Sequence, residues 1–121
     1  MRIAIVDDQA DFRKALRKIV EQEPGLTVVA EAKNGLDAIG AVIEHKPDVV
    51  LIGIRKPSAN GLDATKVIRS KFPRARVITL SMHSDSTMTA MSCQAGACSH
   101  LCKTCSPDEI VAAIRDAHLK K

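Results

Sequence analysis

The stretch Asp48-Val-Val-Leu-Ile-Gly53-Ile-Arg-Lys-Pro57 decides the fold of this chain. Its apolar residues 49–52 form a continuous run, which is typical of a parallel strand that is covered by helices on both faces. The polar residues and the proline that follow indicate a loop. The stretch therefore predicts a buried strand that has Gly53 at its carboxyl end.

The same pattern, a short β-branched run followed by a segment of helical period, repeats five times along the 121 residues. The predicted strands are residues 2–6, 26–31, 48–52, 76–80 and 98–102. An apolar stripe that can face a sheet follows each strand. Alternating strands and helices of this kind predict the α/β class.

The ends of two predicted helices carry recognisable signals. Ser106 can cap the last helix and Glu109 completes a capping box with it, while Pro107 suits the first helical position. The fourth helix, over about residues 84–95, has the weakest apolar stripe, and Gly96 is its expected terminator.

A (βα)5 chain of this size is expected to adopt the doubly wound, flavodoxin-like fold with the parallel strand order 2-1-3-4-5. Ligands bind such sheets at the carboxyl ends of the strands. The residues that close the predicted strands and meet at this edge are Asp7, Asp8, Gly53, Ser81 and Lys103. We therefore expect the functional site there.

Length and composition indicate one domain over residues 1–121 that needs no disulfide to fold. The net charge of +4 is spread over several segments and the chain has only two aromatic residues, so we expect no direct contact with nucleic acid. No apolar run approaches the roughly 18 residues needed to span a bilayer. Without a secretory pattern after Met1, a cytoplasmic location is expected.

The four cysteines are spaced C-x4-C-x3-C-x2-C between residues 93 and 105. If residues 98–102 form a strand, Cys98, His100 and Cys102 share a face, but the outer sulfurs lie about 13 Å apart along it, too far for one metal. Cys102 and Cys105 could meet across the following turn, with His100 or His83 nearby. A metal or redox role therefore remains an alternative to buried or half-buried thiols.

Several blocks of sequence, taken in order, resemble one known family over about residues 2–118. The blocks include Ile3-Ala-Ile-Val-Asp-Asp8, Pro47-Asp-Val-Val-Leu-Ile, Asn60-Gly-Leu-Asp-Ala-Thr65, Val77-Ile-Thr-Leu-Ser-Met-His83 and Leu101-Cys-Lys103. In this order and spacing they resemble the receiver domain of response regulators, in particular the NarL/FixJ-like subgroup. Members of that subgroup usually precede a helix-turn-helix DNA-binding output domain, which the present chain does not include.

The resemblance implies a magnesium site and a phosphoacceptor aspartate. Asp7 and Asp8 match the acidic pair of the family, and the backbone carbonyl of Arg55 matches a further metal ligand. Gly53 matches the acceptor and has no side chain. Magnesium binding should therefore be weakened, and phosphoryl transfer lacks its nucleophile.

Two further positions match the switch of the family. Ser81 matches the hydroxyl that reads the phosphoryl group, and Lys103 matches the lysine that balances its charge. A direct pair between Lys103 and a carboxylate is the alternative. His100 stands where the family has an aromatic residue that swings between exposed and buried positions. Asp48 cannot replace the acceptor, because it lies about 16 Å back along the strand from Gly53.

The sequence thus predicts a non-enzymatic pseudo-receiver that regulates through protein contacts, independently of phosphorylation. By resemblance, its partners would be a histidine kinase, a second copy of the chain and an output domain. One alternative is an unconventional phosphoacceptor such as Ser58. Another is the metal or redox sensor built from cysteines and histidines.

Overall fold

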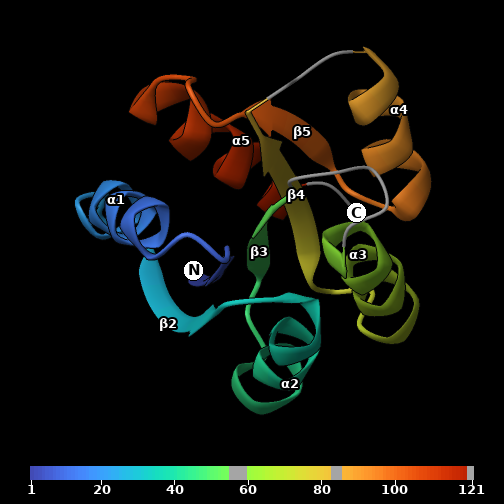
Figure 1. Cartoon of the computed structure of the whole chain (residues 1–121). Coiled ribbons are helices and arrows are strands. Elements are labelled where there is room, and N and C mark those ends of the chain that lie inside the picture. Colours follow the sequence, from blue (N-terminus) through green and yellow to red (C-terminus); the bar gives the residue numbers. More distant parts are fainter. Residues whose placement is uncertain (55–59, 83–85, 120–121) are drawn as a thin grey trace.

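The apolar run 49–52 lies in the central strand of one parallel sheet in the computed structural model, which describes residues 1–54, 60–82 and 86–119 (Figure 1). The elements, in chain order, are β1 Arg2–Val6, α1 Ala10–Glu21, β2 Thr27–Ala32, α2 Gly35–His45, β3 Val49–Gly53, α3 Asn60–Lys71, β4 Arg76–Ser81, α4 Ser86–Ala95, β5 Ser99–Cys102 and α5 Pro107–Leu119. The strand order is β2-β1-β3-β4-β5. The predicted flavodoxin-like fold is confirmed, with element boundaries shifted by one or two residues.

Side chains that alternate along the strands build two cores, one on each face of the sheet. On one face Ile5 and Leu51 pack with α1 and α5, through residues such as Leu16 and Ile114. On the other face the alternate strand residues pack against α2, α3 and α4. Figure 1 shows this three-layer arrangement, in which α1 and α5 lie on the opposite side of the sheet from α2, α3 and α4.

The predicted signals at the helix ends are present. Ser106 Oγ accepts a hydrogen bond from the backbone N–H of Glu109 at 3.2 Å, which is the capping contact. Gly96 ends α4 with a φ of 108°, and the N–H of Ala97 donates to Ser92 O at 3.0 Å. A left-handed residue at this place satisfies carbonyls that the helix leaves open.

The amino edge of the sheet holds Asp48, which confirms that it lies far from Gly53. Asp48 Oδ2 accepts a hydrogen bond from the backbone N–H of Arg2 at 2.7 Å and so joins β3 to β1.

Within the described residues, no helix has the length and apolar character required to cross a bilayer.

Replacing Gly96 by alanine should lower the free energy of unfolding by about 1–3 kcal/mol. A Cβ at this position would lie 2.5 Å from Arg69 Cγ, and the positive φ disfavours any side chain. Gly40→Ala is the matched control, because a Cβ there meets nothing within 4 Å and alanine favours the helix by about 0.5–1 kcal/mol. Urea unfolding of both variants measures the difference, and equal stabilities would contradict the expectation.

Candidate functional site

Three of the predicted site residues at the carboxyl edge of the sheet lie against one another. Asp7 directly follows β1, Gly53 ends β3, and Lys103 directly follows β5. The N–H of Asp7 donates to Ala32 O at 3.0 Å, and the N–H of Lys103 donates to Ser81 O at 2.8 Å. Both residues are thus held by extensions of the strand ladders, so their side chains start from fixed positions.

An ion pair between Asp7 and Lys103 forms the centre of the site. Lys103 Nζ lies 2.6 Å from Asp7 Oδ2, and the two side chains are only 4% and 1% exposed. The ammonium also lies 4.5 Å from the centre of the Phe12 ring and 3.4 Å from Gln9 Oε1. The pair connects the ends of β1 and β5, which are not neighbours in the sheet.

The two oxygens of Asp7 have different surroundings. Oδ1 accepts a hydrogen bond from the backbone N–H of Gln9 at 2.8 Å. Oδ2 is buried and accepts no hydrogen bond from the described residues, so its contact with Lys103 is one of opposite charges without hydrogen-bond alignment. Oδ2 is therefore an oxygen that could bind a hard cation.

The absence of a side chain at Gly53 gives the Asp7 carboxylate its space. A Cβ built on Gly53 would lie 1.9 Å from Asp7 Oδ2 and 2.8 Å from its Cγ. Real Cβ atoms do not approach other atoms so closely, so the carboxylate occupies the volume in which any side chain at position 53 would begin. Gly53 and the Asp7–Lys103 pair are therefore parts of one arrangement.

The predicted magnesium ligands fit a cation only in part. Asp7 offers Oδ2, but Lys103 Nζ already stands against that oxygen, so a cation at Asp7 requires the lysine to move. Asp8 is exposed, in contrast to Asp7. The other predicted ligand, Arg55, lies outside the described residues, as do Ser58 and His83.

Ser81 and His100 form a second cluster on the α4 side of the sheet. His100 Nε2 lies 3.0 Å from Ser81 Oγ, and His100 Nδ1 lies 2.6 Å from Thr79 Oγ1 and 3.2 Å from Ser92 Oγ. The three hydroxyl-bearing residues are at most 2% exposed. The half-buried imidazole therefore makes hydrogen bonds with buried hydroxyls from both β4 and α4.

Thr79 and Ser92 were missed by the sequence interpretation. The alternation of Thr79 and Ser81 along β4 was a signal that both hydroxyls share a face, and His100 is the partner of Thr79 in the β4–β5 register. Nothing in the local sequence of α4 indicated that Ser92 completes the cluster.

Cys98 and His100 lie on different sides of the sheet. Cys98 precedes β5 and packs with the core under α1 and α5, whereas His100 faces α4, so the expected common face of Cys98 and His100 is wrong. Cys93 is exposed, the other three cysteines are half-buried, and none of the four forms a disulfide. Among the residues that the structure describes, no three His, Cys, Asp or Glu side chains could hold a metal.

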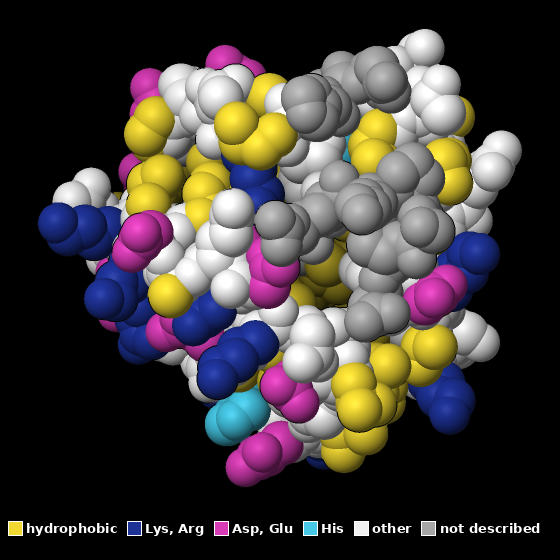
Figure 2. All heavy atoms as spheres, in the orientation of Figure 1, with side chains coloured by type: hydrophobic (Ala, Val, Ile, Leu, Met, Phe, Trp, Pro, Cys, Tyr) yellow, Lys and Arg dark blue, Asp and Glu magenta, His cyan; other side chains and the backbone are white. Residues whose placement is uncertain are grey.

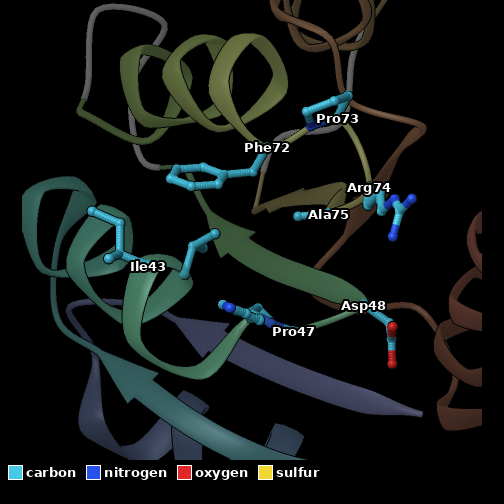
Figure 3. A pocket seen from close by; sticks show the side chains of 9 residues that line it. Ile43, Pro47, Asp48, Phe72, Pro73, Arg74 and Ala75 are labelled. Carbon is cyan, nitrogen blue, oxygen red and sulfur yellow. The ribbon is translucent and has the colours of Figure 1, made fainter.

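A cavity of about 650 Å³ lies at the amino edge of the sheet, away from the ion pair. In Figure 3 the Phe72 ring lies near Ile43 and Pro47, while Asp48 and Arg74 are at the outer side. The residues around this cavity carry no group that matches the predicted chemistry, so we assign the site to the carboxyl edge.

A parallel sheet of this order with a carboxylate, a lysine and a hydroxyl at its carboxyl edge defines the class of receiver-like signalling domains. The chain matches the response regulator receiver domain family over residues 3–115. It therefore belongs to that family, and the predicted resemblance to receiver domains is confirmed.

Named regulatory proteins are similar to this chain over almost its whole length. The chain is 37% identical to the transcriptional regulatory protein LnrK of Bacillus subtilis and 35% identical to the response regulator UvrY of Escherichia coli; each alignment covers 98% of this chain and 54% of the relative. The chain thus spans about half the length of these proteins. The signal receiver domain of a putative NarL from Mycobacterium tuberculosis superposes with a TM-score of 0.91 at 29% identity, covering 99% of this chain and 97% of that domain.

Replacing Lys103 by methionine should lower the free energy of unfolding by about 3–5 kcal/mol, because the Asp7 carboxylate is left buried without a counter-charge. Adding Asp7→Asn in the same chain should restore part of the loss, since the amide carries no net charge. Urea unfolding of the two single variants and the double variant gives the coupling. Lys14→Met, at an exposed lysine of α1, is the control. A Lys103→Met loss no larger than this control would contradict the pair's importance.

Replacing His100 by phenylalanine should cost about 1–3 kcal/mol in total, because the hydrogen bonds between the imidazole and the hydroxyls are lost. The aromatic ring fills similar space but offers Thr79, Ser81 and Ser92 no nitrogen. His118→Phe, at an exposed site on α5, is the matched control and should change stability by less than about 0.5 kcal/mol. If thermal unfolding finds the two variants equally stable, the hydrogen-bond cluster does not contribute as described.

Proposed function

We propose that this chain is a regulatory receiver domain whose state does not depend on a phosphoryl group at position 53. The family's acceptor is an aspartate, and Gly53 stands at the corresponding strand end with no nucleophile to offer. Phosphoryl transfer needs a nucleophile in line with the phosphorus and cations that neutralise its oxygens. A glycine at this place cannot supply the first of these.

The proposal rests on one observation: the Asp7–Lys103 ion pair occupies the space beside Gly53. In the family, the corresponding lysine balances the charge of the phosphoryl group. Here the Asp7 carboxylate supplies that negative charge from within the chain. Breaking a buried pair of this kind costs about 3–5 kcal/mol, so the arrangement favours one state of the site.

Magnesium binding is proposed to be weak rather than lost. Asp7 and Asp8 keep the carboxylates that a hard cation prefers, and Asp7 Oδ2 has no hydrogen bond to lose among the described residues. Lys103 must leave that oxygen before a cation can take its place.

The partners are proposed to be proteins. A histidine kinase, a second copy of the chain and a DNA-binding output domain are the partners that the family resemblance suggests, and the relatives of about twice this length include named transcriptional regulators. We expect the α4–β5 side, or α1 and α5, to make such contacts, with a cytoplasmic location and no enzymatic activity.

The exposed apolar residues indicate one further surface for such contacts. Leu36 and Ile43 of α2 are 80% and 57% exposed. Leu36 and Ile39 also line a shallow groove with Val67 of α3. Figure 2 shows hydrophobic side chains gathered over α2 and α3, so this surface is a candidate contact area beside those proposed above.

Incubation with magnesium and a small phosphodonor should leave the mass of the native chain unchanged. Gly53→Asp is the control: it restores the acceptor and displaces the Asp7 carboxylate, so we expect that variant alone to gain a phosphoryl group. Calorimetry should also show tighter magnesium binding by the variant, because three carboxylates then converge. Intact mass spectrometry reads the result.

A phosphoryl group on the native chain would contradict the proposal. Acid treatment then identifies the acceptor class, because a phosphoserine, for example at Ser58, survives conditions that hydrolyse an acyl phosphate. If neither the native chain nor Gly53→Asp gains mass, the loss of function extends beyond position 53 and interaction partners are the next measurement.

A further inference from the structure

The turn after β5 carries a cysteine at each end, with Lys103 and Thr104 between them. Cys102 is the last residue of β5, and Cys105 follows three residues later. The backbone N–H of Cys105 donates to Cys102 O at 3.1 Å, which closes the turn. Both thiols are free and half-buried. The segment is therefore a C-x2-C motif around the lysine of the ion pair.

The backbone of this turn is suited to a disulfide. A hydrogen-bonded β-turn brings its first and fourth Cα atoms within about 7 Å. A disulfide needs Cα atoms about 4.4–6.8 Å apart. The hydrogen bond of the turn therefore holds the two Cα atoms close to the range that a disulfide spans.

The surroundings of the two sulfurs differ in a way that suits thiol chemistry. Cys102 Sγ lies 3.0 Å from Thr104 Oγ1 and 3.7 Å from Met82 O. Hydrogen bonds from the hydroxyl and the backbone N–H of Thr104 lower the pKa of Cys102 below that of an ordinary thiol. Burial raises the pKa of Cys105, and negative charge on Glu109 and on Cys102 raises it further.

This asymmetry is that of an attacking thiolate and a resolving thiol, since the thiolate is the nucleophile in sulfur chemistry. The third half-buried cysteine, Cys98, lies before β5 and on the core under α1 and α5.

We propose that Cys102 and Cys105 are a peroxide-sensitive dithiol that closes to a disulfide around Lys103. The Cys102 thiolate attacks one peroxide oxygen; the O–O bond breaks and the leaving hydroxide takes a proton to become water. The Cys105 sulfur then displaces the hydroxyl of the Cys102 sulfenic acid, forming the S–S bond and releasing a second water. The two sulfurs lose two electrons in total, and peroxide gains them.

Closure should change the position of Lys103. To reach Cys105, the Cys102 sulfur must leave Thr104 Oγ1 and Met82 O, and the peptide of Lys103 becomes part of a small ring. The Lys103 side chain, which pairs with Asp7, extends from that peptide. The disulfide itself does not rest on the proposed function, because it can form whether or not position 53 accepts a phosphoryl group.

The test is hydrogen peroxide treatment of the reduced native chain, followed by alkylation, intact mass and peptide mapping without reduction. We expect loss of two hydrogens, with residues 102 and 105 joined in one peptide. Cys93→Ser and Cys98→Ser should keep this product, whereas Cys102→Ser and Cys105→Ser should abolish it. A sulfenic acid at Cys102, trapped with dimedone in Cys105→Ser, identifies the attacking thiol.

Thr104 provides an independent readout. In Thr104→Ala, alkylation of Cys102 by iodoacetamide should become slower at neutral pH and its pH midpoint should rise, because the hydrogen bond that favours the thiolate is lost. Thr104→Ser should keep the native profile. Oxidation confined to the exposed Cys93, a disulfide that includes Cys93 or Cys98, or an intact chain with four unmodified thiols would each overturn the proposal.

Discussion

The carboxylate of Asp7 needs both the space above Gly53 and the charge of Lys103. The two side chains are almost completely buried, and each would be costly to leave alone in a medium of low polarity. A Cβ at position 53 would overlap with Asp7 Oδ2, so this orientation of the carboxylate is compatible only with glycine. The absence of one side chain therefore determines which partners the neighbouring charges take, and the pair in turn holds the ends of β1 and β5 together over β3.

The sheet divides the site into two parts. The ion pair faces α1, whose Phe12 ring lies under the ammonium, whereas His100 faces Ser92 of α4 on the other side. Ser81 connects the two parts. Its carbonyl accepts a hydrogen bond from the N–H of Lys103, and its side chain contacts His100. Ser81 therefore contacts both the turn that carries Lys103 and the cluster on the α4 side.

The fold could be predicted because the local signals agreed with one another. Continuous apolar strands, helical stripes and the Ser106 cap all favour the same topology, and agreement of this kind between levels is what makes a sequence specify one structure. The rule for strand ends likewise placed Asp7, Gly53 and Lys103 on one edge. The contact between Asp7 and Lys103 could be offered only as an alternative, because it depends on side-chain rotamers and on free volume at Gly53. The full cluster of Thr79, Ser92 and His100 could not be predicted, because these residues are distant in sequence. A serine or threonine hydroxyl can also bond to a nearby backbone group, so its type alone does not indicate a distant partner.

Both proposals concern the segment 102–105. It is held by the Lys103 N–H to Ser81 O, by the Cys105 N–H to Cys102 O and by the ammonium to Asp7, so its backbone and its charged side chain are fixed together. In a receiver with an acceptor aspartate, a new charge at position 53 would act on the lysine side chain. In this chain the Asp7 carboxylate occupies the volume of a Cβ at position 53, and the proposed dithiol lies at the two ends of the turn. Under the two proposals, a covalent change at this turn acts on Lys103 from its backbone side, in place of a phosphoryl group that acts on its side chain.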